Sequence, residues 1–566
     1  MRRGRAWPGL TAGLALGLAG APSLADPPAG AGTAPAAVRS GVTTHFSQGW
    51  PARLMDDAAA MGAVTVRDSV HWAKVELAPG QLVFTEANSG HVGRACAAGM
   101  TVLLGLEPRN PLYDGGQTIW SPTGQAAFAR YVRALADRWP RCVVAVEVGN
   151  EINGAKGMTG PAAALRARAH VGLVKAVHLA VKPAHPGLVL LGGSTNTIAT
   201  GFLARLFAGG LLDWADAIAV HPYRAEPEGL DAELGRVIQA MRRAGRVRPI
   251  WATEFSRDFP DPALAPAFYL KSAALMESAG VADHFWYALA DQPGFPTMGL
   301  ERLDGTRKPA GRAFAFAARA LAPLGPAQRV GHGDAMLVHL RYSGDAHVVW
   351  GAPRALFAPP GARAFAADGS PVPVPARISE VPVVIRSAPA LGFGPAEVLA
   401  DSLHDFGEAI GGARGSLAWF ARRADGTLLP LAPVDWDWTS YLGHPALPGF
   451  AANPGGIGTA PGLATVVRYV APAGATGSGP APVTASLCLA PTIPGMRAEA
   501  MLVRGGQALW RAPVGPRGPV QATLTTALVA GERLDLVLSP LAGGPAARFR
   551  YRLRIARGAT AEPAPC

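Results

Sequence analysis

Cysteine, lysine and long apolar runs are scarce in this sequence, and each scarcity excludes something. The chain has 566 residues but four cysteines, and none of them lies in a CxxC or other zinc-binding pattern. Beyond the N-terminus no apolar run approaches the roughly 18 residues that a membrane helix needs. No block of five or more Lys or Arg residues occurs. We therefore expect no cysteine-bound zinc, no membrane span and no nucleic-acid partner, and the oligomeric state is left open.

The four cysteines allow two interpretations in an exported protein. One is pairing within each half of the chain, Cys96 with Cys142 and Cys488 with Cys566. The other leaves Cys96 and Cys142 as free buried thiols. Spacing alone does not choose between them.

The formal net charge of +12 also has two readings. It suits an acidic polysaccharide or another anionic partner. However, only six of the basic residues are lysines, and the chain is rich in Ala, Gly, Pro and Arg, as a GC-rich coding sequence makes it. The composition of the coding sequence is therefore a better explanation of the positive charge than an anionic partner.

The first 25 residues have the pattern of a secretory signal peptide. A basic start, M-R-R-G-R, is followed by the apolar residues 10–20 and by S-L-A at 23–25. We predict cleavage after Ala25 by the ordinary secretory route and a secreted or periplasmic protein. Residues 26–40 are mostly Pro, Ala and Gly and are predicted to be a linker.

Apolar, strand-like runs then alternate with segments of helical period, such as 124–139 and 160–181. This alternation predicts a parallel sheet wrapped by helices. Eight such runs over about 285 residues suit a (β/α)8 TIM barrel, which typically takes about 250. The α/β barrel is predicted over 41–325, with strands at 41–46, 64–68, 101–107, 143–150, 188–193, 217–221, 249–255 and 284–289.

Beyond the barrel the pattern changes to short strands broken by Pro and Gly, with no long helical period. We predict a β-rich accessory domain over 326–395 and a C-terminal β-sandwich over 396–566. The aromatic residues of the second region suit either a carbohydrate-binding face or the core of the sandwich. They are Trp419, Trp436, Trp438, Tyr441 and Tyr469.

Two glutamates end apolar runs that are the fourth and seventh of the eight. Glu151 follows Asn150 in V-E-V-G-N-E-I-N, and Glu254 lies in P-I-W-A-T-E-F-S. Active sites of such barrels lie at the carboxyl ends of the strands, so the two carboxylates should face each other. This arrangement is typical of retaining glycoside hydrolysis, with Glu151 as acid/base, Glu254 as nucleophile and Asn150 holding the sugar 2-OH.

Other strand ends offer supporting side chains. Arg67 ends the second run and should keep Glu254 ionised. His221 and Tyr223, in V-H-P-Y, are placed to hydrogen-bond that carboxylate or the substrate. Trp286 should stack on a sugar face, and His45 should form another wall of the site.

Each of these predictions has a structural alternative. Arg67 would instead pair with Asp68 or Glu76, and His221 and Trp286 would be core residues. Four further carboxylates compete for the catalytic roles. They are Glu107, Glu147, Asp258 and Asp291, of which Glu147 lies within a strand and is expected to be structural.

These residues resemble a known group of enzymes. The G-N-E, H-P-Y and T-E-F motifs are similar to those of the clan of retaining glycoside hydrolases with a (β/α)8 barrel and two catalytic glutamates. The segments V-R-D-S-V-H-W-A-K-V-E-L-A-P-G-Q-L-V-F and N-P-L-Y-D-G-G resemble bacterial family 39-like glycosidases, including the exopolysaccharide-cleaving type. The resemblance covers residues 41–325. It implies a covalent glycosyl-enzyme, no metal or other cofactor, and a β-sandwich after the barrel.

The sequence thus predicts an exported retaining glycosidase that cleaves β-glycosidic bonds in an oligo- or polysaccharide. A rival interpretation is a catalytically inactive glycan-binding protein that uses the same barrel and β domains. A weaker rival is a polysaccharide lyase or a transglycosylase. Neither the sugar, the linkage nor endo against exo action follows from the sequence.

Overall fold

The computed structural model describes residues 39–413, 415–472, 480–516 and 518–558. The predicted signal peptide, most of the predicted linker and Cys566 lie outside these residues. The first strand begins at Arg39, so the last two residues assigned to the linker belong to the barrel.

Eight parallel strands close into a barrel, in the order β1-β10-β9-β8-β7-β6-β5-β2, and each overlaps one of the eight predicted runs. The predicted fold class is therefore confirmed. The strands are β1 (Arg39–Thr43), β2 (Thr65–Asp68), β5 (Thr101–Leu106), β6 (Val143–Val148), β7 (Val189–Asn196), β8 (Ala217–His221), β9 (Ile250–Phe255) and β10 (Val281–Trp286).

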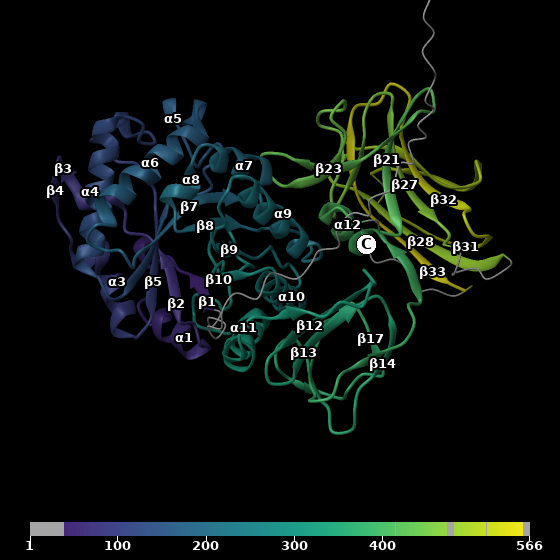
Figure 1. The fold of residues 1–566 in the computed structure, drawn as a ribbon, viewed down its shortest axis with the longest axis horizontal. Helices are drawn as coiled ribbons and strands as arrows, with labels where there is room; N and C mark the ends of the chain where they lie inside the picture. Colours follow the sequence, from purple (N-terminus) through teal and green to yellow (C-terminus); the bar gives the residue numbers. More distant parts are fainter. Residues whose placement is uncertain (1–38, 414, 473–479, 517, 559–566) are drawn as a thin grey trace, which may run out of the picture. The chain divides into compact units, whose positions relative to one another are not determined.

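Helices wrap the outside of these strands (Figure 1). The predicted helix at 124–139 is α4, which begins after the N-cap Ser121 with Pro122 in its first turn. The predicted helix at 160–181 is divided at Leu165 into two helices. The helices of the barrel are α1 (Leu54–Met61), α2 (Trp72–Val75), α3 (Glu86–Ala97), α4 (Pro122–Arg138), α5 (Pro161–Ala164), α6 (Arg166–Val181), α7 (Thr200–Ala208), α8 (Leu211–Trp214), α9 (Leu230–Arg243), α10 (Ala265–Ser278) and α11 (Pro309–Ala320), with a hairpin of β3 (Glu76–Ala78) and β4 (Gln81–Leu82) after α2.

Strand side chains alternate between the inside of the barrel and the surrounding helices. On the inside, Leu103, Leu191, Trp251 and Phe285 pack with three alanines into a buried cluster. The outward-facing strand residues form one large core with the helices. The interior below the strand ends is thus filled with apolar side chains, which leaves the carboxyl ends of the strands for polar groups.

Antiparallel sheets follow the barrel, as predicted. The first group forms a six-stranded sheet, β11-β12-β13-β18-β15-β16, and a three-stranded sheet, β17-β14-β19. Its strands are β11 (Gln328–Arg329), β12 (Leu337–Tyr342), β13 (Ala346–Gly351), β14 (Arg354–Phe357), β15 (Arg363–Phe365), β16 (Pro371–Val372), β17 (Arg377–Ile378), β18 (Val383–Arg386) and β19 (Gly392–Phe393).

The C-terminal region forms two larger sheets, β20-β33-β28-β31 with β26, and β22-β21-β27-β32-β29-β30, together with the small sheet β23-β24-β25. Both large sheets contribute to one apolar core, as in a β-sandwich. Its strands are β20 (Val398–Asp401), β21 (Leu417–Arg423), β22 (Leu428–Pro430), β23 (Ala432–Asp435), β24 (Ser440–Gly443), β25 (Ala451–Ala452), β26 (Ile457–Thr459), β27 (Leu463–Val470), β28 (Ala481–Pro491), β29 (Ala498–Arg504), β30 (Gln507–Val514), β31 (Val520–Leu528), β32 (Arg533–Pro540) and β33 (Ala547–Arg557).

One helix does occur in this part of the chain, where the sequence shows no long helical period. Helix α12 (Ser402–Gly411) is capped by the Asp401 side chain, which accepts a hydrogen bond from the Leu403 N–H. Its buried residues Leu403, Phe406 and Ile410 do have helical spacing. Two glycines within ten residues lower the helix propensity and hide the signal.

Among the helices of the described ranges, none has the length and apolar character needed to span a bilayer.

Cys96 and Cys142 form a disulfide, with their Cα atoms 5.5 Å apart. The bridge joins the end of α3 to the residue before β6. Of the two interpretations of these cysteines, pairing is therefore the one that the structure supports. The predicted partner of Cys488, Cys566, lies outside the described residues.

Candidate active site

Glu147, on β6, is the buried centre of the polar network at the strand ends. Its Oε2 accepts a hydrogen bond from Arg67 Nε at 2.8 Å. Its Oε1 accepts from Ser194 Oγ at 2.7 Å and from Thr253 Oγ1 at 3.0 Å. Burial alone would raise the pKa of Glu147, but the charge of Arg67 and the contacts of His221 hold it well below its usual range. Glu147 is thus a fixed, wholly buried carboxylate, as expected for a structural residue.

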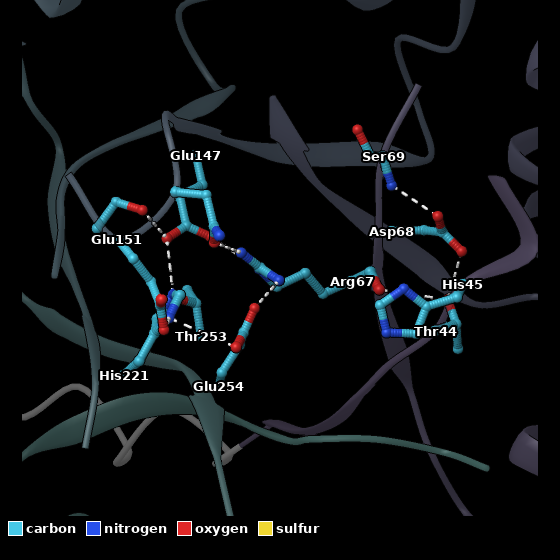
Figure 2. A network of polar contacts seen from close by, with 12 residues as sticks. Thr44, His45, Arg67, Asp68, Ser69, Glu147, Glu151, His221, Thr253 and Glu254 are labelled. Atoms are coloured by element: carbon cyan, nitrogen blue, oxygen red, sulfur yellow. Dashed lines mark hydrogen bonds and ion pairs between the residues drawn. The ribbon is translucent and has the colours of Figure 1, made fainter. Parts of the chain in front are cut away.

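Arg67 connects this buried carboxylate to the proposed nucleophile. Its guanidinium contacts Glu254 Oε1 through Nη1 at 2.5 Å and Asn150 Oδ1 through Nη2 at 3.1 Å. Figure 2 shows the arginine extended between the two glutamates. The alternative partners are engaged elsewhere: Asp68 accepts from Thr44 Oγ1 and Glu76 accepts from Trp72 Nε1. Arg67 therefore lies where the sequence predicted, beside Glu254.

His221, at the end of β8, lies among three carboxylates and is fully buried. Its Nε2 is 3.3 Å from Glu147 Oε1, and its Nδ1 is 3.4 Å from Glu151 Oε1 and 3.5 Å from Glu254 Oε2. Burial lowers the pKa of His221, but the charge of Glu254 and the hydrogen bonds with Glu147 and Glu151 outweigh it and raise the pKa to about 9. The imidazole is therefore protonated at neutral pH.

Glu151 and Glu254 face each other across the mouth of the barrel. One carboxylate oxygen of each lies within 4.8 Å of the other and of a ring nitrogen of His221. The two side chains differ in access to solvent, with 31% of Glu151 exposed against 9% of Glu254. Tyr223 OH donates to Glu254 Oε2 at 2.7 Å. Burial and the charge of Glu254 raise the pKa of Tyr223 far above its usual value, so the phenol keeps its proton and remains a donor.

The proposed acid, Glu151, is held differently. Asn196 Nδ2 donates to its Oε1 at 2.6 Å. Burial raises the pKa of Glu151, but the hydrogen bonds from His221 and Asn196 prevail and lower it. Its backbone has a positive φ of 46°, an uncommon conformation for a residue with a side chain. Glu151 is therefore an ionised, partly exposed carboxylate on a constrained backbone.

A cavity of about 520 Å³ opens above these groups. His45 lines it as predicted, and its ring packs edge-on against Tyr287, with ring centroids 5.5 Å apart. Burial lowers the pKa of His45, which favours the neutral ring. The predicted site residues on the cavity wall are His45, Arg67, Asn150, Glu151, Tyr223 and Glu254.

The prediction that Trp286 stacks on a sugar is wrong. Trp286 is 0% exposed, packs against Phe255, Phe259 and Tyr269, and donates from Nε1 to the Met298 carbonyl. Its predecessor, Phe285, points into the barrel, so alternation directs Trp286 outward to the helices. The next residue, Tyr287, lines the cavity instead. Because side chains alternate along F-W-Y, Tyr287 lies on the same side as Phe285, and the sequence alone could have identified Tyr287 as the residue at the cavity.

Asn196 and Ser194 were missed because the predicted fifth strand was ended at Gly193. The strand continues through a bulge, with a register shift against β8 between Gly192 and Thr195. Gly193 and Ser194 both have positive φ, at 99° and 43°. A bulge re-aims side chains, and here it turns the Ser194 hydroxyl to Glu147. The polar S-T-N that follows the two glycines was the available signal.

Of the competing carboxylates, only Glu107 is among the described residues that line the cavity. Asp258 accepts a hydrogen bond from Thr297, and Asp291 accepts one from Lys308 Nζ at 2.7 Å. Neither lies on the cavity wall.

Glu151, His221 and Glu254 also have the residue types of a metal site. However, the raised pKa of His221 means that both ring nitrogens carry protons at neutral pH. An imidazolium donates hydrogen bonds and has no lone pair for a metal ion. A metal ion would therefore have to displace a proton from His221 before it could bind here.

No protein-family model and no curated protein matches this chain. Among solved structures, a family 39 glycoside hydrolase from the gut symbiont Bacteroides cellulosilyticus WH2 matches with a TM-score of 0.51 and 18% identity, over 62% of this chain and 80% of that one. The likeness shows a shared fold. A GH30 endoxylanase from Clostridium papyrosolvens C71 matches with a TM-score of 0.47 and 12% identity, over 64% of this chain and 97% of that one. A GH39 β-xylosidase from Caulobacter crescentus matches with a TM-score of 0.41 and 17% identity, over 64% and 95%.

Proposed function

We propose that this protein is an exported retaining glycoside hydrolase that cleaves β-glycosidic bonds in an oligo- or polysaccharide. The observation that carries the proposal is the approach of the Glu151 and Glu254 carboxylates to within 4.8 Å at the mouth of a barrel. Carboxyl groups of retaining glycosidases are about 5 to 5.5 Å apart, whereas inverting enzymes need about 6.5 to 9.5 Å to admit water. The basic and apolar pattern of residues 1–25 supports export.

The contacts suit a double displacement. Glu254, paired with Arg67 and oriented by Tyr223, attacks the anomeric carbon and forms a covalent bond to it. The bond from that carbon to the leaving oxygen breaks, and the oxygen takes a proton from Glu151. Glu151 then removes a proton from water, whose oxygen attacks the anomeric carbon and releases Glu254. Asn150, fixed by Arg67, can bind the 2-OH of the sugar in both steps.

Glu151 must gain a proton before the first step, because its hydrogen bonds favour the ionised form. His221 is a protonated group within 3.4 Å of it. Glu151 and His221 therefore titrate as one coupled system.

Substitution of the two glutamates tests the proposal. Glu151→Ala and Glu254→Ala should each lower turnover of an aryl β-glycoside by orders of magnitude. Azide should restore activity to Glu254→Ala and give a glycosyl azide of inverted configuration, which NMR identifies. Glu107→Ala, which removes a carboxylate from the cavity wall and not from the pair, is the matched control.

Near-wild-type activity of both alanine variants would show that the assignment is wrong. Tight binding of a glycan with no product after long incubation would favour the inactive binding protein. A product with the mass of an unsaturated sugar would identify a lyase, and longer oligosaccharides would identify a transglycosylase.

A further inference from the structure

A turn of the C-terminal region, residues 436–439, contacts the barrel beside the active site. It joins β23 to β24. The Asp437 carbonyl accepts a hydrogen bond from Asn153 Nδ2 at 3.0 Å, and the Trp436 carbonyl accepts one from the Gly201 N–H at 3.1 Å. Ser440, just after the turn, is buried with its Oγ 3.0 Å from Thr200 Oγ1. The turn is thus held to the barrel by its backbone.

The same asparagine connects the turn to the proposed acid. Asn153 Oδ1 accepts from the Asn196 N–H at 2.9 Å, and its Nδ2 also donates to the Asn196 carbonyl at 3.0 Å. Asn196 in turn donates from Nδ2 to Glu151 Oε1 at 2.6 Å. Two asparagines therefore link the backbone at Asp437 to the carboxylate of Glu151.

Trp438 is the exposed side chain of this turn. Almost half of it, 48%, is accessible to solvent. Its Cη2 would lie 3.8 Å from a Cβ on Gly154, whose N–H donates to the Glu151 carbonyl at 2.8 Å. The other tryptophan of the turn, Trp436, packs on Tyr441 with ring centroids 4.9 Å apart. Trp438 alone leaves an indole open to solvent next to the backbone that carries Glu151.

We propose that Trp438 forms an aglycone subsite, where its indole stacks on the leaving-group sugar of the substrate. The inference rests on the proposed function, because the acid protonates the leaving oxygen and the leaving sugar must therefore lie on the side of Glu151. A rigid aromatic ring binds the apolar face of a pyranose, and its loss of exposure on binding is favourable. The C-terminal region thereby completes the substrate site of the barrel.

Two kinds of substrate with the same reacting sugar test this subsite. Xylobiose, cellobiose and β-1,4-mannobiose have a leaving sugar, whereas β-xylosyl, β-glucosyl and β-mannosyl fluoride have none. Trp438→Ala should lower kcat/KM on the hydrolysed disaccharide by about tenfold, a loss of about 1.4 kcal/mol of binding. The kcat/KM for the matching fluoride should change by less than about twofold. Trp438→Phe, which keeps an aromatic ring, should recover most of the loss.

Phe357→Ala is the matched control, because Phe357 is also an exposed aromatic residue, 62% accessible, but lies on β14 in another sheet. It should leave both substrates unaffected. An unchanged disaccharide rate in Trp438→Ala, or an equal loss on both substrates, would overturn the subsite. If the wild-type protein hydrolysed none of the six compounds, the result would count against the proposed function itself and would remove the subsite with it.

Discussion

Arg67 has three partners that a lysine could not satisfy together. Its planar guanidinium places separate N–H groups on Glu147, Glu254 and Asn150. Because Glu147 is fully buried, loss of the arginine would break the buried ion pair at Glu147 Oε2, and breaking such a pair typically costs about 3 to 5 kcal/mol. The position of the nucleophile is thus tied to the stability of the barrel interior.

His221 gives a prediction on pH. Its pKa is raised from 6.5 to about 9, so its charge stabilises the folded protein fully below pH 6.5 and this contribution is lost as the pH rises through about 9. The free energy of unfolding of the wild type, minus that of His221→Gln, should therefore fall by about 3 kcal/mol between pH 6 and pH 10. Urea unfolding at each pH measures it.

His178→Gln is the control for this measurement. The His178 ring contacts the Trp214 carbonyl at 2.8 Å rather than a carboxylate. A difference for His221→Gln that depends on pH no more than the difference for His178→Gln would contradict the raised pKa of His221.

At this scale the sequence predicted residues whose place follows from counting strands. Glu151, Glu254, Arg67 and Tyr223 lie at strand ends or within three residues after them, and parallel strands bring their ends together. Asn196 was missed because it depends on a bulge, whose backbone conformation is not evident from composition. Trp286 was misassigned because residue type was considered without the alternation that decides which side of the strand it faces.

At the scale of elements, strands were easier to predict than helices. The eight barrel runs are apolar because parallel strands are buried on both faces, so they stand out from their surroundings. Helix α12 does not, since its glycines weaken the signal and its capping depends on Asp401. That aspartate is itself fixed by Arg552 and Arg554, which lie about 150 residues further along the chain. Such distant contacts cannot be predicted from local pattern.

The disulfide gives the prediction for this scale. It closes a loop with a sequence separation of 46 residues. In the chain-entropy model a bridge of this length stabilises the folded state by about 4 kcal/mol. Cys96→Ala should lose this amount in urea unfolding, and the double variant with Cys142→Ala should lose no more, because the bridge is already absent. A double variant as stable as the wild type would show that the bridge contributes nothing.

At the scale of the whole molecule, the change of sequence pattern near residue 326 marks the change from the barrel to antiparallel sheets. It does not show that the apolar core of the barrel continues into the sheets. Trp350, on β13, is fully buried and belongs to the same apolar core as the barrel helices. Its Nε1 donates to Glu228 at 3.2 Å, and Glu228 also pairs with Lys271 of α10 at 2.6 Å. A buried ion pair shared by two regions has no signature in either stretch of sequence alone.

The charge of the whole chain and the charge of its cavity have opposite signs. The chain carries +12, whereas the described residues of the cavity wall include four carboxylates and a single arginine. Unlike the surface, the cavity should therefore select against anionic sugars. The kcat/KM for 4-nitrophenyl β-glucoside should exceed that for the glucuronide by at least about tenfold, since a like charge about 4 Å away costs up to about 4 kcal/mol near a protein surface. Faster cleavage of the glucuronide would contradict this. If the prediction holds, an acidic polymer is attracted to the basic surface, but the cavity cleaves it only at its neutral units.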